Sequence, residues 1–376
     1  MKVLHLISGG DTGGAKTHII SLMKGLERYI DAKIICFIKD TFYDEVKAAK
    51  IDIEVFEQKG RLDMSVITRL EEEINKQNYD IIHCHGARAN FVGMFLKRRL
   101  KKPFITTIHS DYELDFKDNF YKKLIFTNLN KFALKRFDYY IAISDSFKEM
   151  LIERGFNSNE IYTAYNGIDL DSEMTYISKD DFFKRYNIDS ANKTIVGIIA
   201  RLDQVKDHET FIRAADKVLK VRDDVLFLIA GEGNDEKRLL SIVGELGIGG
   251  YVHFLGYVKD PYSFFNAIDI NVLTSISESF PYVILEGARM KKTIISTKVG
   301  GVGKLIKDDN NGYIIDIGDI DALADKINHL LDNQGKIKTL GENLYRDVKD
   351  NFSSEPMAKR HLGIYQEILE SVEDKQ

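Results

Sequence analysis

The feature that most constrains the fold is a regular alternation of short runs rich in Val, Ile and Phe with longer segments of helical period. This alternation is typical of βαβ units stacked around a parallel sheet. Most of the runs are almost continuously apolar, as expected for strands that helices cover on both faces. The sequence therefore predicts an α/β protein with strands at 2–8, 32–38, 52–56, 80–85, 104–109, 139–144, 160–165, 194–202, 225–233, 251–258, 269–275, 293–299 and 312–317.

A break in this rhythm suggests two domains. Asn166-Gly167 and the polar stretch from Asp169 to Asp181 separate two series of strands, and the chain of 376 residues exceeds what one core usually organises. We predict two doubly wound, Rossmann-like domains over 1–180 and 181–353, with a cleft between the carboxyl ends of their strands. Residues 354–376 are expected to form a closing helix that packs back on the first domain.

Composition excludes several classes of protein. A net charge of −5 argues against a nucleic-acid partner. Cys36 and Cys84 both lie in apolar strand-like runs, so no disulfide is expected. The first residues contain too short an apolar run for a signal peptide, and no later run approaches the roughly 18 residues of a membrane span. We therefore expect a cytoplasmic protein.

A glycine-rich loop follows the first strand, at residues 8–15, and precedes a helical pattern. Such a loop lets backbone N–H groups approach a phosphate at the positive end of a helix. Its spacing is not the dinucleotide fingerprint, because Asp11 stands where glycine is needed. A plain turn explains this loop as well as a phosphate site does.

Charged residues in the second half suggest a diphosphate site. Arg201 and Lys206 follow the strand at 194–202, where two cations suit a leaving diphosphate, although a solvated surface pair is the alternative. Glu278 lies in the loop after a later strand, and Glu286 lies in the apolar segment VILEGA of the helix that follows. A carboxylate in that setting needs a partner, such as a ligand hydroxyl or a nearby loop backbone. We favour a ligand, because the cations and carboxylates would share one edge of one sheet.

The motifs taken together resemble family 4 of the retaining glycosyltransferases, over almost the whole chain. Those that carry the resemblance are GGAKTH (13–18), YNGID (165–169), ARLDQVK (200–206), AGEG (230–233), FLGYV (254–258), ESFPYVILE (278–286), KVGGV (298–302) and NGYII (311–315). The resemblance implies a GT-B fold, with an acceptor-binding first domain and a second domain that binds a nucleoside-diphosphate sugar.

The resemblance also implies a role for particular residues. Arg201 and Lys206 would bind the donor diphosphate, Glu286 the ribose hydroxyls, and Glu278 the donor sugar beside the backbone of Ser279 and Phe280. His109 would face the transferred sugar. The catalytic set is then His109, Arg201, Lys206 and Glu278, and the donor-binding set is Gly13, Gly14, Arg201, Lys206, Gly256, Tyr257, Glu278, Ser279, Phe280, Pro281 and Glu286.

The implied reaction is hexosyl transfer from a nucleoside-diphosphate sugar to a glycan or lipid-linked acceptor, in cell-surface polysaccharide or glycolipid synthesis. The alternatives are a nucleotide-sugar 2-epimerase of the same fold and a non-catalytic partner subunit. Two departures from the family pattern leave donor preference open: Ser279 stands where glycine is commoner, and Gly303-Lys304 replaces Pro-Glu.

No cofactor or metal is expected. Such enzymes work without a bound metal, and no Asp-x-Asp motif lies in a suitable loop. His83 and His85 share one face of a strand, but the sequence offers no third ligand beside them, so we interpret them as strand-end histidines.

One region is strongly basic. Bases outnumber acids between Phe91 and Phe137, and they alternate with aromatic and leucine side chains. The pattern suits a helix lying on an anionic inner membrane leaflet and, equally, a solvated helix face. The bases are Lys97, Arg98, Arg99, Lys101, Lys102, Lys117, Lys122, Lys123, Lys131, Lys135 and Arg136.

Overall fold

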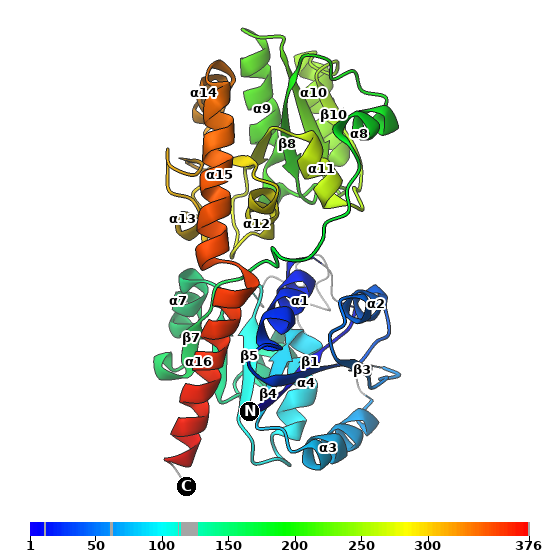
Figure 1. Cartoon of the computed structure of the whole chain (residues 1–376), viewed down its shortest axis with the longest axis vertical. Coiled ribbons are helices and arrows are strands. Elements are labelled where there is room, and N and C mark those ends of the chain that lie inside the picture. The colour runs from blue at the N-terminus through cyan, green and yellow to red at the C-terminus, as the bar shows by residue number, and fades with distance from the viewer. Residues whose placement is uncertain (11–12, 61–62, 112, 114–126, 375–376) are drawn as a thin grey trace. The chain divides into compact units, whose positions relative to one another are not determined.

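The computed structural model describes residues 1–376 except 11–12, 61–62, 112, 114–126 and 375–376. The chain forms two compact units (Figure 1). The first contains Met1–Asp169 and Phe352–Gln376, and the second contains Leu170–Asn351. Each unit is a parallel sheet between helices, which confirms the predicted α/β class.

The first unit contains a seven-stranded sheet in the order β3-β2-β1-β4-β5-β6-β7. The strands are β1 (Lys2–Ile7), β2 (Asp31–Cys36), β3 (Ile53–Val55), β4 (Ile81–His85), β5 (Phe104–Ile108), β6 (Tyr139–Ala142) and β7 (Ile161–Thr163). The helices described in this unit are α1 (Gly14–Leu26), α2 (Thr41–Ala48), α3 (Ser65–Gln77), α4 (Gly86–Leu96), α6 (Asn128–Leu134), α7 (Asp145–Glu153) and α16 (Ser354–Glu373).

Alternate residues of these strands face different helices. On one face, Val3, Ile81 and Ile105 pack with residues of α1 and of the C-terminal helix α16. On the other face, Leu4 and Ile82 pack with residues of α3 and α4. Burial on both faces explains the nearly continuous apolar runs of the sequence.

The second unit contains a six-stranded sheet in the order β10-β9-β8-β11-β12-β13. The strands are β8 (Thr194–Ile199), β9 (Val225–Ala230), β10 (Val252–Phe254), β11 (Ile270–Leu273), β12 (Thr293–Thr297) and β13 (Tyr313–Ile315). The helices are α8 (Lys179–Tyr186), α9 (His208–Leu219), α10 (Glu236–Leu246), α11 (Pro261–Ala267), α12 (Tyr282–Arg289), α13 (Val302–Leu305), α14 (Ile320–Asp332) and α15 (Gln334–Asn351).

The two units divide at Asp169 and Leu170, earlier than the position 180 expected from the sequence. Contacts of the segment before Leu170 explain this boundary. Ile168 forms a β-bridge with Ser353, and the carboxylate of Asp169 lies 2.6 Å from Nζ of Lys24 on α1. The chain therefore stays attached to the first unit until Asp169, and α16 returns to that unit after Asn351.

Candidate functional site

The strand order of the second sheet places its ligand-binding edge between β8 and β11. The chain runs from β8 outward to β9 and β10, then crosses to β11 on the other side of β8. Ligands of open α/β sheets bind at such a reversal, beyond the carboxyl ends of the strands. Arg201 and Lys206 follow β8, and Glu278 follows β11, so all three lie in loops at this edge.

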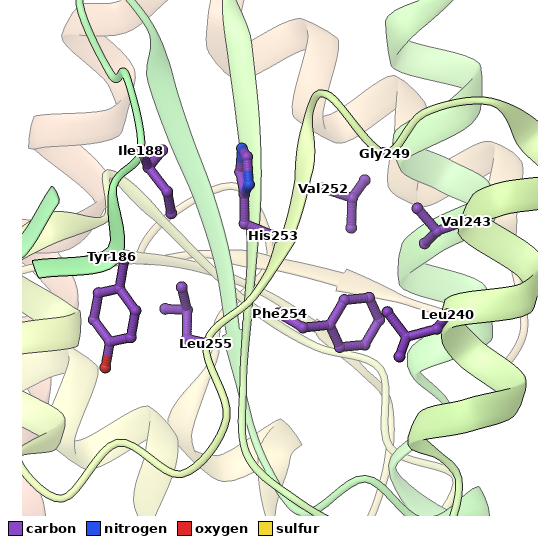
Figure 2. Close-up of a pocket in the computed structure, with 9 residues that line it drawn as sticks. All are labelled: Tyr186, Ile188, Leu240, Val243, Gly249, Val252, His253, Phe254 and Leu255. Atoms are coloured by element: carbon purple, nitrogen blue, oxygen red, sulfur yellow. The ribbon is translucent and has the colours of Figure 1, made fainter.

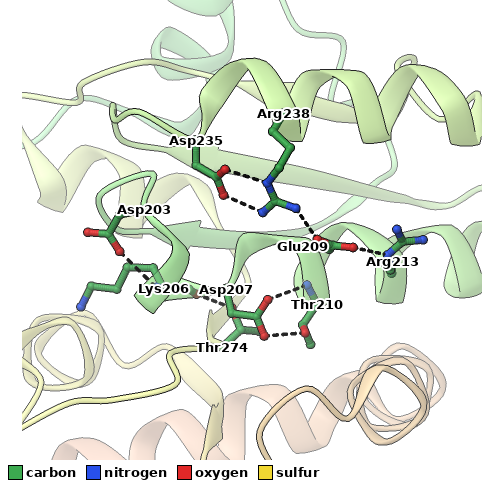
Figure 3. A network of polar contacts seen from close by, with 9 residues as sticks. All are labelled: Asp203, Lys206, Asp207, Glu209, Thr210, Arg213, Asp235, Arg238 and Thr274. Carbon is green, nitrogen blue, oxygen red and sulfur yellow. Dashed lines mark hydrogen bonds and ion pairs between the residues drawn. The ribbon is translucent and has the colours of Figure 1, made fainter.

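The backbone of Lys206 is fixed from both sides (Figure 3). Its N–H donates to Oδ1 of Asp203 at 3.2 Å, and its carbonyl accepts from Oγ1 of Thr274, just after β11, at 2.9 Å. The next residue, Asp207, begins α9 with φ of +47° and accepts from the backbone and hydroxyl of Thr210. The loop thus holds Lys206 in one place while its ammonium group points away from the drawn network.

That ammonium group forms an ion pair with Glu278. Nζ of Lys206 lies 2.6 Å from Oε1 of Glu278, and the same oxygen accepts from Oγ of Ser275 at 2.6 Å. The two side chains are only 20% and 12% exposed. Two residues far apart in the sequence are therefore brought together in a partly desolvated position, where charge interactions are stronger than on an open surface.

Glu286, on α12, is a partly buried carboxylate. Within the described part of the chain it forms no hydrogen bond or ion pair. Burial raises the pKa of its carboxyl group to about 7. A carboxylate that is buried without a protein partner is free to accept hydrogen bonds from a bound ligand.

The Glu278 loop packs tightly on the loop after β12. Gly300 has φ of +46°, and a Cβ added there would lie 1.9 Å from the carbonyl oxygen of Glu278. The N–H of Gly301 donates to the carbonyl of Ser279 at 2.8 Å, and the ring of Phe280 is 2% exposed. The glycines of KVGGV therefore allow the close approach that fixes residues 278–280.

Arg201 is placed differently from Lys206. Its side chain is 80% exposed and lies 3.2 Å from the carboxylate of Asp203. An exposed pair of this kind contributes about 0–1 kcal/mol to stability. Arg201 is thus at the predicted edge of the sheet, and its described ion pair is with Asp203, which also accepts from the Lys206 N–H, rather than with Glu278.

The loops after β9 and β10 continue the same edge. Gly231 donates its N–H to the carbonyl of Gly256 at 2.8 Å, and Leu202 donates to the carbonyl of Glu232 at 2.9 Å. Oε1 of Glu232 accepts from the N–H of Tyr257 at 3.3 Å. The resemblance places Gly256 and Tyr257 in the donor-binding set, and one backbone group of each is already engaged by the loop after β9.

In the first unit, the predicted glycines lie at the start of α1. Gly13 occupies the N-cap position with φ of +67°, no side chain caps this end, and its first turn contains no acidic residue. A Cβ added at Gly13 would meet no atom of the described residues within 4 Å, its two chain neighbours aside. Among the described residues, therefore, no side chain caps the N–H groups at the start of this helix, an arrangement that suits an anion. Asp11 and Thr12 lie outside the described residues.

His109 follows β5 and is partly exposed. Its Nε2 lies 3.2 Å from Nδ1 of His85, and its ring meets that of His18 edge-on with centroids 4.7 Å apart. Burial, with a smaller contribution from His361, lowers the pKa of His109 to about 4. The ring is therefore neutral near pH 7.

Comparison with known proteins agrees with this arrangement. Residues 12–172 match the family model described as Glycosyltransferase Family 4, and residues 178–347 match the model described as Glycosyl transferases group 1. The chain belongs to the family 4 glycosyltransferases. The two matches correspond closely to the two structural units of this glycosyltransferase.

Several curated relatives of this glycosyltransferase are similar over most of its length. N-acetyl-alpha-D-glucosaminyl L-malate synthase of Bacillus anthracis is 27% identical, over 82% of this chain and 80% of that protein. An Escherichia coli protein, UDP-Gal:alpha-D-GlcNAc-diphosphoundecaprenol alpha-1,3-galactosyltransferase, is 24% identical over 87% and 82%. N,N'-diacetylbacillosaminyl-diphospho-undecaprenol alpha-1,3-N-acetylgalactosaminyltransferase of Campylobacter jejuni is 25% identical over 93% and 95%.

Solved structures confirm the GT-B fold of this glycosyltransferase. Anabaena Alr3699/HepE in complex with UDP-glucose matches with a TM-score of 0.78 and 24% identity, covering 99% of this chain and 100% of that one. The lipopolysaccharide outer core galactosyltransferase WaaB, in its apo form, matches with a TM-score of 0.71 and 18% identity, covering 98% and 100%.

The structure of this glycosyltransferase places further histidines beside His83 and His85. The sequence offered no third ligand beside His83 and His85, but His5 of β1 lies directly opposite His83 in the sheet. His18, His109 and His361 surround the same group of rings. The sequence does not reveal this cluster, because its members come from β1, α1, β4, the end of β5 and α16.

A hollow in the second unit lies apart from the predicted site residues (Figure 2). It has a volume of about 320 Å³ and lies at the edge strand β10. Figure 2 shows Phe254 of β10 beside Leu240 of α10. None of the residues assigned to donor binding or catalysis lines it.

The basic region lies partly outside the described residues, which exclude Lys117, Lys122 and Lys123. In the described part, Lys97 pairs with Asp138, and Arg99 pairs with Glu71 at 2.9 Å. No helix among the described residues combines the length and apolar character that a membrane crossing requires.

Proposed function

We propose that this glycosyltransferase moves a hexosyl group from a nucleoside-diphosphate sugar to a glycan or lipid-linked acceptor, with retention of the donor's anomeric configuration. The observation that carries the proposal is the Lys206–Glu278 pair at the reversal of the second sheet, 2.6 Å apart. Around a diphosphate ligand, a fixed cation stabilises negative charge that grows as the sugar–phosphate bond breaks.

The printed names of relatives support the choice of donor and acceptor. HepE has been solved with UDP-glucose, and two relatives are named for transfer to diphospho-undecaprenol carriers. We therefore infer a role in building a cell-surface polysaccharide or glycolipid, in the cytoplasm or on the inner face of the membrane.

Each residue has a specific role in the proposed reaction. Lys206 and Arg201 bind the diphosphate, and Glu286, which lacks a protein partner among the described residues, accepts from ribose hydroxyls. The resemblance implies that the departing phosphate oxygen takes the proton of the acceptor hydroxyl. No protein nucleophile is then needed, and Glu278 and His109 position the sugar.

The decisive experiment is a thermal-shift screen of nucleoside diphosphates and their sugars, followed by a transfer assay with the ligand that binds. A ligand that binds only the native protein raises its melting temperature by mass action. We expect one base to raise it most, and the matching sugar donor to be consumed only when acceptor is present.

Other outcomes would favour the alternatives. Interconversion of the donor sugar without acceptor would indicate a 2-epimerase of the same fold. No shift with any member of the panel would indicate a non-catalytic partner subunit and would overturn the proposal.

We expect transfer to continue at the same rate after treatment with EDTA, because the proposed reaction uses no metal.

We also propose that the basic region at 91–137 docks the enzyme on anionic membrane. The described bases Arg98, Lys101 and Lys102, next to α4, support this with positive charge close to partly buried aromatic residues. We expect the protein to co-sediment with vesicles that contain phosphatidylglycerol. The bound fraction should fall as the salt concentration rises. Equal co-sedimentation with neutral vesicles would contradict the proposal.

A further inference from the structure

Six histidines gather in the first unit, on the face of the sheet that α1 and α16 cover. They are His5, His18, His83, His85, His109 and His361, and neighbouring rings lie with centroids 4.2–6.2 Å apart. The proposed transfer reaction uses only His109. The imidazoles behind it therefore need an explanation of their own.

Three of these rings form a continuous row of hydrogen bonds, which we call the histidine row. Nδ1 of His5 lies 3.0 Å from Nε2 of His85, and Nδ1 of His85 lies 3.2 Å from Nε2 of His109. His5 and His85 are fully buried, whereas His109 is partly exposed. Nδ1 of His109 forms no hydrogen bond within the described part of the chain. The row thus runs from the interior of the first unit to an unused ring nitrogen of His109.

The protons of the histidine row are coupled. Burial lowers the pKa of His5 to about 3, that of His109 to about 4 and that of His85 well below its usual value. Near pH 7 each ring is therefore neutral and carries one N–H and one lone pair. Because every hydrogen bond needs one donor and one acceptor, all three rings must adopt the same tautomer. Either each Nδ1 carries the proton, or each Nε2 does.

The buried end of the row distinguishes the two arrangements. Nε2 of His5 is buried and has no hydrogen-bond partner within the described residues. With the protons on Nε2, that atom would be a buried N–H group without an acceptor. With the protons on Nδ1, it is a buried lone pair without a donor. Unpaired N–H groups are the rarer of the two in protein interiors, so this end of the row favours the proton on Nδ1.

Two neighbouring rings show the same arrangement. Nδ1 of His18 lies 3.0 Å from Oδ1 of Asn166, and Nδ1 of His361 lies 2.9 Å from the carbonyl oxygen of Met357. These oxygens only accept, and burial lowers the pKa of both rings, so each neutral ring has its proton on Nδ1. Both Nε2 atoms are buried and lack partners among the described residues. This interior therefore already holds two unpaired lone pairs at Nε2, and His5 would add a third.

We propose that His5 and His85 are positioning residues that fix the tautomer of His109, so that His109 presents an N–H group at Nδ1. The significance of that group rests on the proposed function, in which His109 faces the transferred sugar. An N–H at Nδ1 donates to an oxygen of the sugar, whereas a lone pair there would accept from a sugar hydroxyl. The row also keeps His109 neutral, because a second proton on its Nε2 would face the N–H of His85.

The test is the tautomer of His109 in the full chain, with ¹⁵N in its nine histidines. Long-range ¹H–¹⁵N correlation spectra distinguish a protonated ring nitrogen from a bare one, and the signals of His109 are those lost in His109→Phe. We expect the proton on Nδ1, although an unconstrained histidine in water favours Nε2. A proton on Nε2, or equal populations of the two tautomers, would overturn the proposal. This measurement on the unmodified protein needs no variant of the row to fold.

A matched pair of variants tests the contribution of the row itself. His85→Phe removes the donor to Nε2 of His109 and should shift His109 toward the Nε2 tautomer. His361→Phe removes a buried ring of the same cluster that lies outside the row, and it should leave the proton on Nδ1. An unchanged tautomer in His85→Phe, or the same shift in both variants, would overturn the proposal.

Transfer kinetics test whether His85 acts through His109. We expect His85→Phe to lower turnover about tenfold, and to lower it little further when His109 is already replaced by Phe. Losses that multiply in the double variant would overturn the positioning role. The tautomer is measured without any sugar. A protein with the expected tautomer that transfers no sugar would therefore contradict the proposed function and still support the fixing of His109 by the row.

Discussion

Lys206 and Glu278 form the best-connected charged pair of the candidate site. Glu278 accepts from both the lysine ammonium and the hydroxyl of Ser275, while the lysine backbone is fixed by Asp203 and Thr274. A cation held in this way needs little rearrangement to meet a diphosphate, and this is the source of electrostatic catalysis.

Removing this cation should slow the reaction. We expect Lys206→Ala to lower turnover at least tenfold, which corresponds to about 1.4 kcal/mol of transition-state stabilisation. Turnover is measured with saturating donor. Lys220→Ala is the matched control, since that lysine forms an ion pair with Asp216 on the surface at 2.7 Å and is 67% exposed. Unchanged turnover in the Lys206 variant would exclude the proposed role.

Glu286 should make stability depend on pH. Its pKa is raised from 4.5 to about 7 in the folded protein, so its charge destabilises the fold, an effect absent below about pH 4.5 and complete above pH 7. Glu286→Gln should therefore raise the free energy of unfolding more at pH 8 than at pH 5, by about 1–2 kcal/mol after allowing for partial exposure, and the melting temperature should rise accordingly. The same variant should lose the thermal shift with nucleoside diphosphate. A variant less stable than the unmodified protein at pH 8 would contradict this prediction.

At the scale of elements, the site depends on how closely its loops approach one another. The loop after β12 touches the Glu278 loop at Gly300, and the loop after β9 touches the end of β8 at Gly231, where a Cβ would lie 1.9 Å from the carbonyl oxygen of Ala200. The KVGGV and AGEG motifs therefore need glycine at these two positions, because only glycine lets the loops of the site pack this closely.

A side chain at Gly300 should disturb the site from outside it. Gly300→Ala places a Cβ against the Glu278 carbonyl in a backbone conformation with positive φ, at a cost of about 1–3 kcal/mol. We expect lower stability and at least tenfold weaker nucleoside-diphosphate binding, measured by calorimetry. Gly303→Ala is the control, because no atom lies within 4 Å of its added Cβ. Equal binding by both variants would show that the loop contact is unimportant.

At the scale of the whole molecule, the end of the chain completes the unit in which the chain begins. Helix α16 contributes Ile364, Tyr365 and Ile368 to the core that contains Val3 and Ile81. The hydroxyl of Tyr365 also lies 2.7 Å from Nδ1 of His83. The first unit therefore depends on residues more than two hundred positions away in the sequence.

A change in α16 should affect the first unit selectively. Ile364 is fully buried, so Ile364→Ala is expected to destabilise the first unit by about 2–4 kcal/mol. Hydrogen exchange should accelerate in β1 and β4 and remain unchanged in β8 and β9. Gln366→Ala serves as the control, because Gln366 is on the same helix but exposed. Faster exchange in both sheets would mean that the units unfold together.

The sequence alone determined the elements and the fold class. Each predicted run became a strand, because burial on both faces leaves a local apolar pattern that can be read without knowing the neighbours. The family motifs also identified the residues of the candidate donor site, Lys206, Glu278 and Glu286 among them. Local pattern, however, does not encode which distant strands pair.

Only the tertiary structure decided what lies beside what. The contact between Lys206 and Glu278 exists because β8 pairs with β11 rather than only with its successor β9. The histidine cluster exists because β1 pairs with β4 and because α1 and α16 cover the same face. Strand order and helix packing are set by long-range burial. The local pattern around His83 and His85 therefore contains no information that His5 and His18 lie next to them.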